Sequence, residues 1–431
     1  MLPILSSAEM READAREVAR RGQAALVADA GTAVALTAKS MLGSCYGRRV
    51  AVIAGPGLNG ADGRVAARWL SGRGARVRVL DVGREPAELV GYDLVIDAAF
   101  GLGCSSAYDA PLVGATPVLA LGLVSGVDAD TGRVFGRSLA ADVTLALGAL
   151  KYAHVAGPAA ELAGEVRLAT LSIPCTPRDG VIEDADLAGV VARSRDDHKW
   201  SHAVTVLAGS DLMPGAAALV CEGALAAGAS MIRLASRGDV ETLSLPVEVV
   251  RTSEVAIDPR SRAVVAGPGL GEGAPAWLAS RLATTRAPVV LDADGLDREL
   301  ITRRNEESEW VLTPHAGEFA RLGGATSSNR LEDVRALAFA TGCVVLLKGP
   351  RTIVAAPDGR ARVVTAGTPA LATAGSGDVL GGVIAALLAY GNDALSAAAL
   401  GAHLHGRAGT RLADGASALP AEVTSVLARA E

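Results

Sequence analysis

Short apolar runs that end in glycine-rich loops and lead into helical segments recur along the whole chain. Val50–Ala54 ends in the loop Gly55–Gly63, and Ala263–Ala266 ends in Gly267-Pro-Gly-Leu-Gly271. Strands that alternate with helices predict βαβ units, because parallel strands need a crossover connection. With 50 glycines and only 3% aromatic residues, the core has to be built from Ala, Val and Leu. Such a core suits parallel strands buried between helices.

The length of the chain and one internal linker predict two domains. At 431 residues the chain exceeds one ordinary domain. Pro174 and Pro177, followed by the charged stretch Arg193–Asp197, mark a linker, and we place the boundary near residue 190. We therefore predict an α/β protein with one domain in residues 1–190 and a second in residues 191–431.

Charge and cysteine content limit the kinds of binding partner and the cellular compartment that we expect for this protein. The formal net charge is −6 and no block of Lys or Arg stands out, so we expect no nucleic-acid partner. The longest apolar stretches are interrupted by glycines and charges, so we expect no membrane partner. The N-terminus lacks the regions of a secretory signal. The cysteines, odd in number and widely spaced, predict a reduced, cytoplasmic protein; they are Cys45, Cys104, Cys175, Cys221 and Cys343.

Periodicity predicts the individual elements. Residues 7–38 have the spacing of a helix capped by Ser6 or Ser7. Expected strands of the first half are Val50–Ala54, Arg76–Val82, Leu94–Ala98, Pro117–Leu121 and Val143–Leu147. Those of the second half are Ala203–Ala208, Met231–Ala235, Ala263–Ala266, Val289–Leu291, Val311–Leu312 and Val344–Leu347, with a hairpin of Thr352–Ala356 and Ala361–Val364. Expected helices of this half begin near Gly215, Ala274, Gly317, Leu331, Gly377 and Ala394.

The sharpest chemical feature is Thr373-Ala-Gly-Ser-Gly-Asp378, which precedes the apolar stretch Val379–Tyr390. A Gly-Ser-Gly turn that enters a helix exposes unpaired backbone N–H groups, which with the helix dipole form an anion site suited to a phosphoryl group. A carboxylate beside bound phosphate would be repelled unless it had a chemical role. Asp378 is therefore interpreted as the base that takes a proton from an attacking hydroxyl, with a plain helix cap as the alternative.

Other strand ends carry groups that would complete such a site. Lys348-Gly-Pro-Arg-Thr352 brings a cation and a hydroxyl that can bind nucleotide phosphates. In Thr313–Glu318 the histidine could meet a substrate and the glutamate could hydrogen-bond at a helix start. Asp292-Ala-Asp-Gly295 puts carboxylates where α/β sheets bind ligands. His403 and His405 do not face one another on a helix, so we interpret them as structural rather than as a metal site.

Taken in order, these segments resemble the ADP/ATP-dependent NAD(P)H-hydrate dehydratase family, which has the ribokinase-like fold. The resemblance begins near Asp196 and spans nearly the whole second half. It rests on the segments HKW, AGSDLMPGAAAL, AGPGLG, LDADGL, LTPHAGEFARL, LLKGPRT and GTPALATAGSGDVLGG. An ordered set of this kind is far more specific than one glycine motif.

The resemblance implies repair of a damaged cofactor. In NADH or NADPH hydrate, water has added to the nicotinamide ring, and its hydroxyl is a poor leaving group. The family phosphorylates this hydroxyl with ADP or ATP and then eliminates phosphate. With ADP, the form that bacterial members generally use, the S-form of the hydrate would give NAD(P)H, AMP and phosphate, with Mg²⁺ assisting. Asp378 would deprotonate the ring hydroxyl.

The remaining site residues follow from the resemblance position by position. The backbone of Ala374, Gly375, Ser376 and Gly377 would hold the transferring phosphoryl group. The nucleotide would be bound by Lys348, Gly349, Pro350, Arg351, Thr352 and Gly377. The positions that touch the hydrate would be Ala216, Gly269, His315 and Asp378.

The first half resembles the NAD(P)H-hydrate epimerases, which bind the hydrate in a Rossmann-like αβα domain. The matching segments lie within about residues 8 to 175 and are Gly55–Gly63, Leu94–Gly103 and Ser125–Gly132. A tight turn that enters a helix is the alternative for the first of them alone. The implied hydrate-binding positions are Leu58, Asn59, Gly60, Ala61, Asp62 and Gly101. The implied potassium ligands are Asn59, Asp97 and Ser125, whose oxygen atoms suit a hard cation.

This half departs from the family at the position of proton transfer. The family usually has an aspartate three residues before Ser125, where this chain has Gly122, and glycine cannot move a proton. Leu58 replaces an asparagine and Ala61 a glycine of the family loop. The segment CSSAYDAP lacks the usual basic residue.

Two hypotheses follow for the first half. Asp128 and Asp130 could substitute for the missing aspartate, or they could simply shape a turn. Either the half is an epimerase with altered catalysis, or it has lost the activity and serves binding or assembly. We expect impaired or lost activity.

Two other readings apply to the whole chain. One is a small-molecule kinase of the ribokinase-like class, and the other is a nucleotide-binding regulatory or scaffold protein. The TPHAGE and KGPRT segments and the attached epimerase-like half favour the dehydratase. ADP and ATP, and NADH hydrate and NADPH hydrate, all fit the motifs. The family further implies a homo-oligomer, a tetramer or larger.

Overall fold

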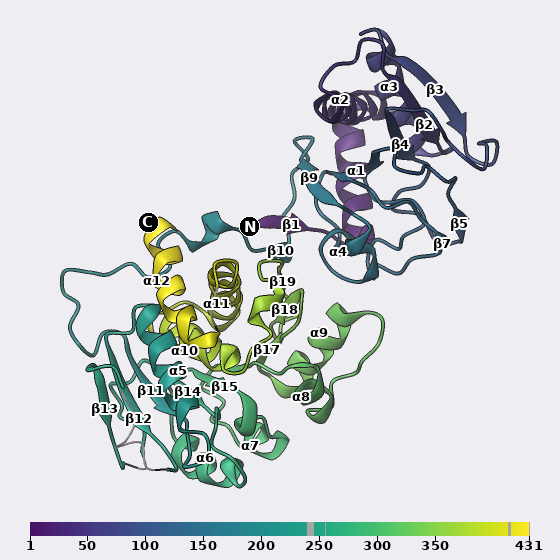
Figure 1. Cartoon of the computed structure of the whole chain (residues 1–431). Coiled ribbons are helices and arrows are strands. Elements are labelled where there is room, and N and C mark those ends of the chain that lie inside the picture. Colours follow the sequence, from purple (N-terminus) through teal and green to yellow (C-terminus); the bar gives the residue numbers. More distant parts are fainter. Residues whose placement is uncertain (239–244, 255, 413–414, 431) are drawn as a thin grey trace. The chain divides into compact units, whose positions relative to one another are not determined.

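The computed structural model describes residues 1–238, 245–254, 256–412 and 415–430, which form two compact units (Figure 1). Leu2–Asp179 make up the N-terminal unit and Gly180–Glu431 the C-terminal unit. The division therefore falls before the boundary expected near residue 190. The reason is that β10 (Asp179–Val181) pairs in parallel with β19 (Ala361–Val364), so the residues after Asp179 already belong to the second sheet.

A parallel sheet is the framework of the N-terminal unit. Its strands run in the order β3 (Arg76–Asp81), β2 (Arg49–Ala54), β4 (Leu94–Ala98), β6 (Val118–Leu121), β8 (Val143–Leu147) and β9 (Glu165–Ala169). All but β9 were expected from the sequence. Val50 and Val52 pack into one core cluster and Ala51 and Ile53 into another, so alternate residues of β2 bury both faces of the sheet.

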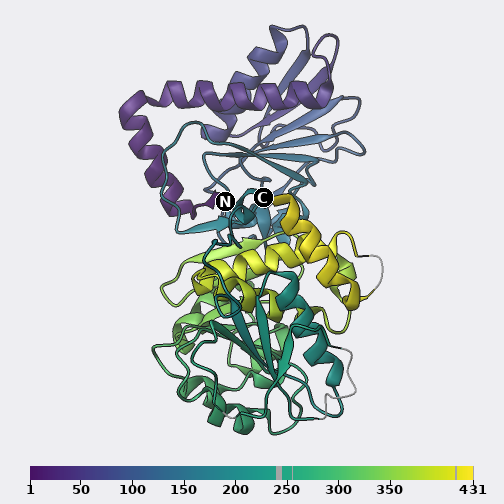
Figure 2. The same ribbon diagram turned by 90° about the vertical axis from the view of Figure 1, so that its left-hand side faces the viewer.

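The first helical segment is two helices, not the single helix expected over residues 7–38. Helix α1 (Ser7–Arg21) begins at a capping box of Ser6 and Glu9, and α2 (Gln23–Leu42) follows at once. Gly22 between them has a φ of 84°, a backbone conformation that glycine reaches without strain and that ends a helix. Figure 2 shows α1 and α2 as two purple helices that meet at an angle.

Helix α2 is the one helix of the described residues that is long and apolar enough to cross a membrane. Its length and composition alone have this character, and core helices of soluble proteins share it. In the N-terminal unit α2 lies against α3 (Leu58–Ser71), and its residues Val34, Ala35 and Ala38 are buried in the core.

The C-terminal unit is built on a larger, mixed sheet. Its parallel strands run in the order β13 (Val249–Arg251), β12 (Met231–Ala235), β11 (Ala203–Leu207), β14 (Ala263–Ala266), β15 (Val289–Leu291), β16 (Trp310–Leu312) and β17 (Val344–Leu347). The hairpin of β18 (Thr352–Ala355) and β19 continues the sheet in antiparallel fashion. The strands of this half that the sequence predicts are all present, while β10 and β13 were not expected.

Helices cover this sheet. They are α5 (Pro214–Ala226), α6 (Ala274–Leu282), α7 (Arg298–Thr302), α8 (Ala316–Arg321), α9 (Arg330–Thr341), α10 (Ser376–Ala389), α11 (Ala394–Gly409) and α12 (Leu419–Ala430). Figure 1 shows α10, α11 and α12 in yellow beside α5, and these helices contact one another. Each helix start that the sequence predicts lies within a residue or so of the observed one, which is inside the usual ambiguity of helix ends.

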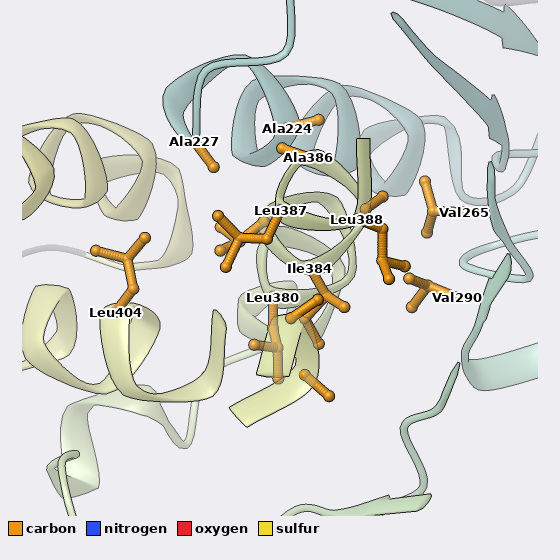
Figure 3. Packing of buried hydrophobic residues seen from close by; sticks show 14 of the residues in the cluster. Ala224, Ala227, Val265, Val290, Leu380, Ile384, Ala386, Leu387, Leu388 and Leu404 are labelled. Atoms are coloured by element: carbon orange, nitrogen blue, oxygen red, sulfur yellow. The ribbon is translucent and has the colours of Figure 1, made fainter. Parts of the chain in front are cut away.

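Two glycines let α5 and α10 touch through their backbones. A Cβ atom on Gly382 of α10 would lie 2.2 Å from the carbonyl oxygen of Val220, and one on Gly223 of α5 would lie 2.5 Å from that of Val379. Figure 3 shows the apolar side chains that surround α10, with Ala224 on the side of α5 and Val265 on the side of the sheet. Helix α10 is therefore packed closely between α5 and the sheet.

Candidate functional site

The N-terminus of α10 offers a backbone anion site in the C-terminal unit. Gly375 at the cap has a φ of 88°, and the Ser376 hydroxyl donates to the Leu371 carbonyl oxygen at 2.7 Å. Among the described residues no side chain caps this helix. The Ser376 N–H donates to the Thr373 carbonyl oxygen at 3.3 Å. The next amide groups of the first turn have no acceptor within the helix, and the helix dipole favours negative charge there. Ala374–Gly377, at this helix start, are the residues expected to hold the phosphoryl group, and we call them the cradle.

An ion pair from two other strand ends adjoins this cradle. Lys348, directly after β17, donates from Nζ to Oδ1 of Asp292 at 2.8 Å, and Asp292 is almost fully buried after β15. A Cβ atom on Gly377 would lie 3.4 Å from Nζ of Lys348 and 3.7 Å from Oδ2 of Asp292. These are ordinary van der Waals distances, so the ion pair lies directly beside the first turn of α10.

Asp378, in the first turn of α10, is held near neutrality. Its pKa is raised from 3.8 to about 7, chiefly by burial and then by the charge of Asp292 and more weakly that of Asp294, while Lys348 opposes the rise. Burial alone would lower the pKa of Lys348, but the carboxylates around it outweigh that effect and raise the pKa. At neutral pH Asp378 can therefore accept a proton while Lys348 stays charged.

Glycine loops shape the wall beside the cradle. Gly269 has a φ of 64°, and a Cβ atom on it would lie 2.6 Å from the Cβ atom of Ala216. Ala216 and Gly269, two of the four residues expected to touch the hydrate in this unit, thus lie against each other. A hydrogen bond joins this loop to the segment after β15: Oδ2 of Asp294 accepts from the N–H of Gly271 at 2.9 Å.

The expected histidine of the site also has a structural role. His315 is the N-cap of α8, where its Nδ1 accepts from the N–H of Gly317 at 3.0 Å and its own N–H donates to Glu318 at 2.8 Å. Its side chain is 61% exposed, whereas that of Glu318 is 9% exposed. His315 is therefore fixed in place and still open to a ligand, and Glu318 adds negative charge near Lys348.

The remaining nucleotide-binding candidates form the turn between β17 and β18. Gly349 and Pro350 are exposed, Arg351 is half-buried, and the Thr352 hydroxyl donates to the Gly349 carbonyl oxygen at 3.3 Å. Lys348 starts this turn, so the turn and the cradle meet at that residue.

His405 is a contributor that the sequence did not reveal. It is buried in α11, and its Nε2 lies 2.9 Å from the carbonyl oxygen of Ser376, the first residue of α10. Burial lowers its pKa to about 4, so at neutral pH the ring is neutral and donates a proton to that carbonyl. His403 instead contacts Asp184 at 2.9 Å. The two rings have different partners, as expected for residues on different faces of a helix. The contact of His405 with the start of α10 can be seen only in the fold.

The N-terminal unit contains a cavity of about 460 Å³. It is lined by residues of α1, α2 and α3 and by the segments that follow β4, β6 and β8. Of the hydrate-binding candidates, Leu58, Asn59, Asp62 and Gly101 line it. Gly60 and Ala61 are not among the lining residues: a Cβ atom on Gly60 would lie 1.9 Å from the carbonyl oxygen of Gly55, so this residue packs against backbone.

The expected potassium ligands surround one backbone carbonyl. The Asn59 amide contacts the carbonyl oxygens of Phe100 and Leu121 at 2.9 and 2.8 Å. The Ser125 hydroxyl donates to Asp97 at 2.6 Å and lies 3.3 Å from the Phe100 oxygen. Burial raises the pKa of Asp97 because its charge lacks solvation. The Asn59 amide nitrogen, not its oxygen, faces these two carbonyl groups. The Asp97 carboxylate, the Ser125 hydroxyl and the Phe100 carbonyl supply oxygen atoms of the kind that fits a hard cation.

Gly122 and its neighbours do not supply the expected acid–base group. Gly122 lines the cavity with a φ of 74°, and its carbonyl oxygen lies 2.6 Å from Nε2 of His154. Asp128 accepts hydrogen bonds from the N–H groups of Asp130 and Thr131, and Asp130 accepts from the N–H of Ser7. Neither aspartate is among the residues that line the cavity. They shape a turn, as one of the two readings of the sequence expected.

Comparisons with known proteins match both halves. Residues 204–429 match the family described as NAD(P)H-hydrate dehydratase, and residues 23–90 match the YjeF-related protein N-terminus. A bifunctional NAD(P)H-hydrate repair enzyme Nnr of Mycobacterium tuberculosis is 38% identical over 404 residues, covering 84% of this chain and 83% of its own.

Solved structures match the C-terminal unit. ADP/ATP-dependent NAD(P)H-hydrate dehydratase from Bacillus subtilis, co-crystallised with ATP and Mg²⁺, is similar with a TM-score of 0.52 and 29% identity, over 58% of this chain and 99% of its own. A ribokinase-like superfamily protein from Enterococcus faecalis has a TM-score of 0.52 at 21% identity, over 60% of this chain and 98% of its own, which shows a shared fold.

Proposed function

The chain belongs to the family of bifunctional NAD(P)H-hydrate repair enzymes, and from this we propose that its C-terminal unit dehydrates the S-form of NADH or NADPH hydrate with ADP. The products would be NAD(P)H, AMP and phosphate. The observation that carries the proposal is Asp378, a carboxyl with a pKa of about 7 in the first turn of α10, beside the backbone cradle and the Lys348–Asp292 pair.

Each group of the cradle has one task in this reaction. Asp378 accepts the proton of the ring hydroxyl as that oxygen attacks the terminal phosphorus of ADP, and AMP leaves with the bridging oxygen. The amide groups of Ala374–Gly377 hold the transferring phosphoryl group, and Lys348 offsets its charge. The phosphate then leaves the ring with the C–O electron pair, and the neighbouring ring carbon loses a proton, which restores the dihydropyridine.

Mg²⁺ fits the carboxylates at the end of β15. Asp292 uses Oδ1 for Lys348, and its Oδ2 faces the cradle, while Asp294 follows two residues later. Such oxygen atoms are the usual partners of Mg²⁺ in nucleotide sites. A bound ion would neutralise phosphate charge, and the residues that would hold it are Asp292 and Asp294.

We also propose K⁺ at Asn59, Asp97 and Ser125 in the N-terminal unit. The cation would compensate the buried Asp97 carboxylate, whose Oδ1 accepts from the Ser125 hydroxyl at 2.6 Å. Exchange of K⁺ for the larger tetramethylammonium ion should lower the melting temperature of the N-terminal unit. An equal melting temperature in both salts would contradict this ligand set.

The assay for the C-terminal unit uses the full chain, purified S-hydrate and ADP. The absorbance of reduced nicotinamide should return, and AMP and phosphate should appear in equal amounts. A parallel reaction with ATP shows which nucleotide is preferred. A small-molecule kinase would transfer phosphate without regenerating the dihydropyridine, so phosphorylated hydrate that accumulates with no return of absorbance would refute the proposal.

A further inference from the structure

The cavity of the N-terminal unit holds ionisable groups to which no chemical step has yet been assigned. Among its described lining residues, those with ionisable side chains are Arg11, Asp14, Asp62, Cys104 and Lys151. Asp62 is 6% exposed, and its Oδ1 has no hydrogen-bond partner among the described residues. An unpaired buried oxygen is costly, so one that lines a cavity is a candidate for contact with a ligand.

We propose that Asp62 is the proton-transfer residue of the N-terminal unit and takes over the task that Gly122 cannot perform. The two residues line the same cavity, Asp62 from α3 and Gly122 from the segment after β6. The proposal rests on the proposed function only in that the ligand is the same hydrate. It also replaces the expectation that the activity of this half is impaired or lost.

The charges around Asp62 suit it to hold a proton. Burial and the charge of Asp14 raise its pKa to about 7. Burial raises the pKa of Asp14 as well, but the ammonium group of Lys151 opposes that rise. Lys151 is 2% exposed and donates to the Ala149 carbonyl oxygen at 2.7 Å, and burial lowers its pKa to about 8. Lys151 thus favours a charged Asp14, and a charged Asp14 favours a protonated Asp62.

The step balances with water as the only co-reactant. Protonated Asp62 gives its proton to the ring hydroxyl, and the C–O bond breaks with its electron pair on oxygen, which releases water. The lone pair of the neighbouring ring nitrogen forms the new double bond, so the ring carbon becomes planar and cationic. Water then adds to either face, forms the C–O bond and returns a proton to the Asp62 carboxylate. The net change is inversion at one carbon.

The experiment follows the interconversion of R- and S-hydrate by the full chain without nucleotide, with the two forms separated by chromatography. The native chain should exceed the uncatalysed rate, and Asp62→Asn should lower the catalysed rate at least ~100-fold. The matched control is Glu12→Gln, which changes an exposed carboxylate of α1 that pairs with Arg16 and should leave the rate unchanged. An unchanged rate in Asp62→Asn would overturn the proposal.

Asp14→Asn provides a second measurement, the pH dependence of the interconversion rate, in a chain that keeps Asp62. In the native chain the rate should fall as pH rises through the pKa of Asp62, because the protonated form starts the reaction. Without the charge of Asp14 this fall should move to lower pH. A profile that does not move would count against the arrangement, even if Asp62→Asn failed to fold.

The S-hydrate and ADP assay separates this inference from the proposed function. Dehydration of S-hydrate by a native chain that does not accelerate interconversion would overturn the inference and leave the proposed function standing. Interconversion without dehydration would do the reverse.

Discussion

At the residue scale, the chemistry of the C-terminal unit depends on how its neighbours set the charge of Asp378. The motif around Asp378 predicts a carboxylate at a helix start, but a motif cannot give a pKa. That value depends on burial and on Asp292 and Lys348, which come from other strands. The position of this carboxyl at a helix start could therefore be predicted from the sequence, whereas the surroundings that raise its pKa required the fold.

Replacing this carboxyl should remove catalysis and spare nucleotide binding. In Asp378→Asn the side chain keeps its size but cannot accept a proton, so we expect kcat to fall ~10²- to 10⁴-fold. Affinity for ADP should change little, because backbone amides and Lys348 remain. In the native chain kcat/KM should rise with pH through about 7, where Asp378 ionises. Turnover in the variant close to the native value, measured by the return of NADH absorbance, would refute the role of Asp378.

The same shift links pH to stability. The folded-state pKa of Asp378 is raised from 3.8 to about 7, so its contribution to stability is fully present below the unfolded value and is lost as pH rises through the folded value. Asp378→Asn does not titrate. The stability of the variant relative to the native chain should therefore increase between pH ~4 and pH ~7 and then level off. Urea unfolding at several pH values tests this, and a difference independent of pH would contradict it.

At the element scale, α10 is set by contact between helix backbones. Gly381→Ala and Gly382→Ala make the same change on adjacent faces of the helix. At Gly382 the new Cβ atom would meet the Val220 carbonyl at 2.2 Å, so we expect a loss of at least ~1–3 kcal/mol in the free energy of unfolding.

Gly381→Ala is the matched control for this prediction. Its new Cβ atom would lie 3.4 Å from a methyl group of Val265, and alanine favours a helix by up to ~1 kcal/mol over glycine. This variant should be close to neutral or more stable in urea unfolding. Equal effects of the two substitutions would contradict the close contact of α5 and α10.

His405 supports the start of the same helix through one hydrogen bond. His405→Phe leaves the Ser376 carbonyl without its buried donor, which should cost ~1–3 kcal/mol in stability. It should also lower kcat, because the cradle is displaced, with little change in the KM for ADP. His403→Phe is the control: it also loses a buried histidine contact, to Asp184, and should reduce stability without the loss of kcat. A similar kcat in both variants would exclude a positioning role for His405.

Elements differ in how well the sequence predicts them, and the reasons are physical. Val344–Leu347 is buried on both faces, so its apolar run identifies it as a strand without knowledge of its neighbours. By contrast β10 has three residues and exists because β19 offers it a pairing edge. The helix break at Gly22 is not predicted, because the helical spacing of apolar residues continues across it. Sequence prediction therefore fails for elements that depend on long-range strand pairing or on the φ angle of one residue.

At the scale of the whole molecule, the two proposed activities would act on one pool of hydrate. The epimer that the dehydratase leaves unused would become its substrate once the N-terminal unit inverted it. An equal mixture of Asp378→Asn and Asp62→Asn chains should therefore repair R-hydrate with ADP, although neither chain does so quickly alone. Complete NADH recovery by the mixture, followed by absorbance, would support transfer through solution. A mixture no faster than either variant would contradict it.

The phosphoryl cradle also determines how this enzyme would look to a mutational scan. Its proposed donors at Ala374–Gly377 are peptide N–H groups, which substitution by alanine leaves in place and only substitution by proline removes. An alanine scan would detect the loss of the Asp378 and Lys348 side chains but not the contribution of these backbone donors. Only substitutions that change the course of the backbone would reveal it, above all at Gly375, where φ is 88° and a Cβ atom would meet Leu219 at 2.3 Å. The position of these N–H groups therefore depends on the path of the backbone and much less on which side chains the residues carry.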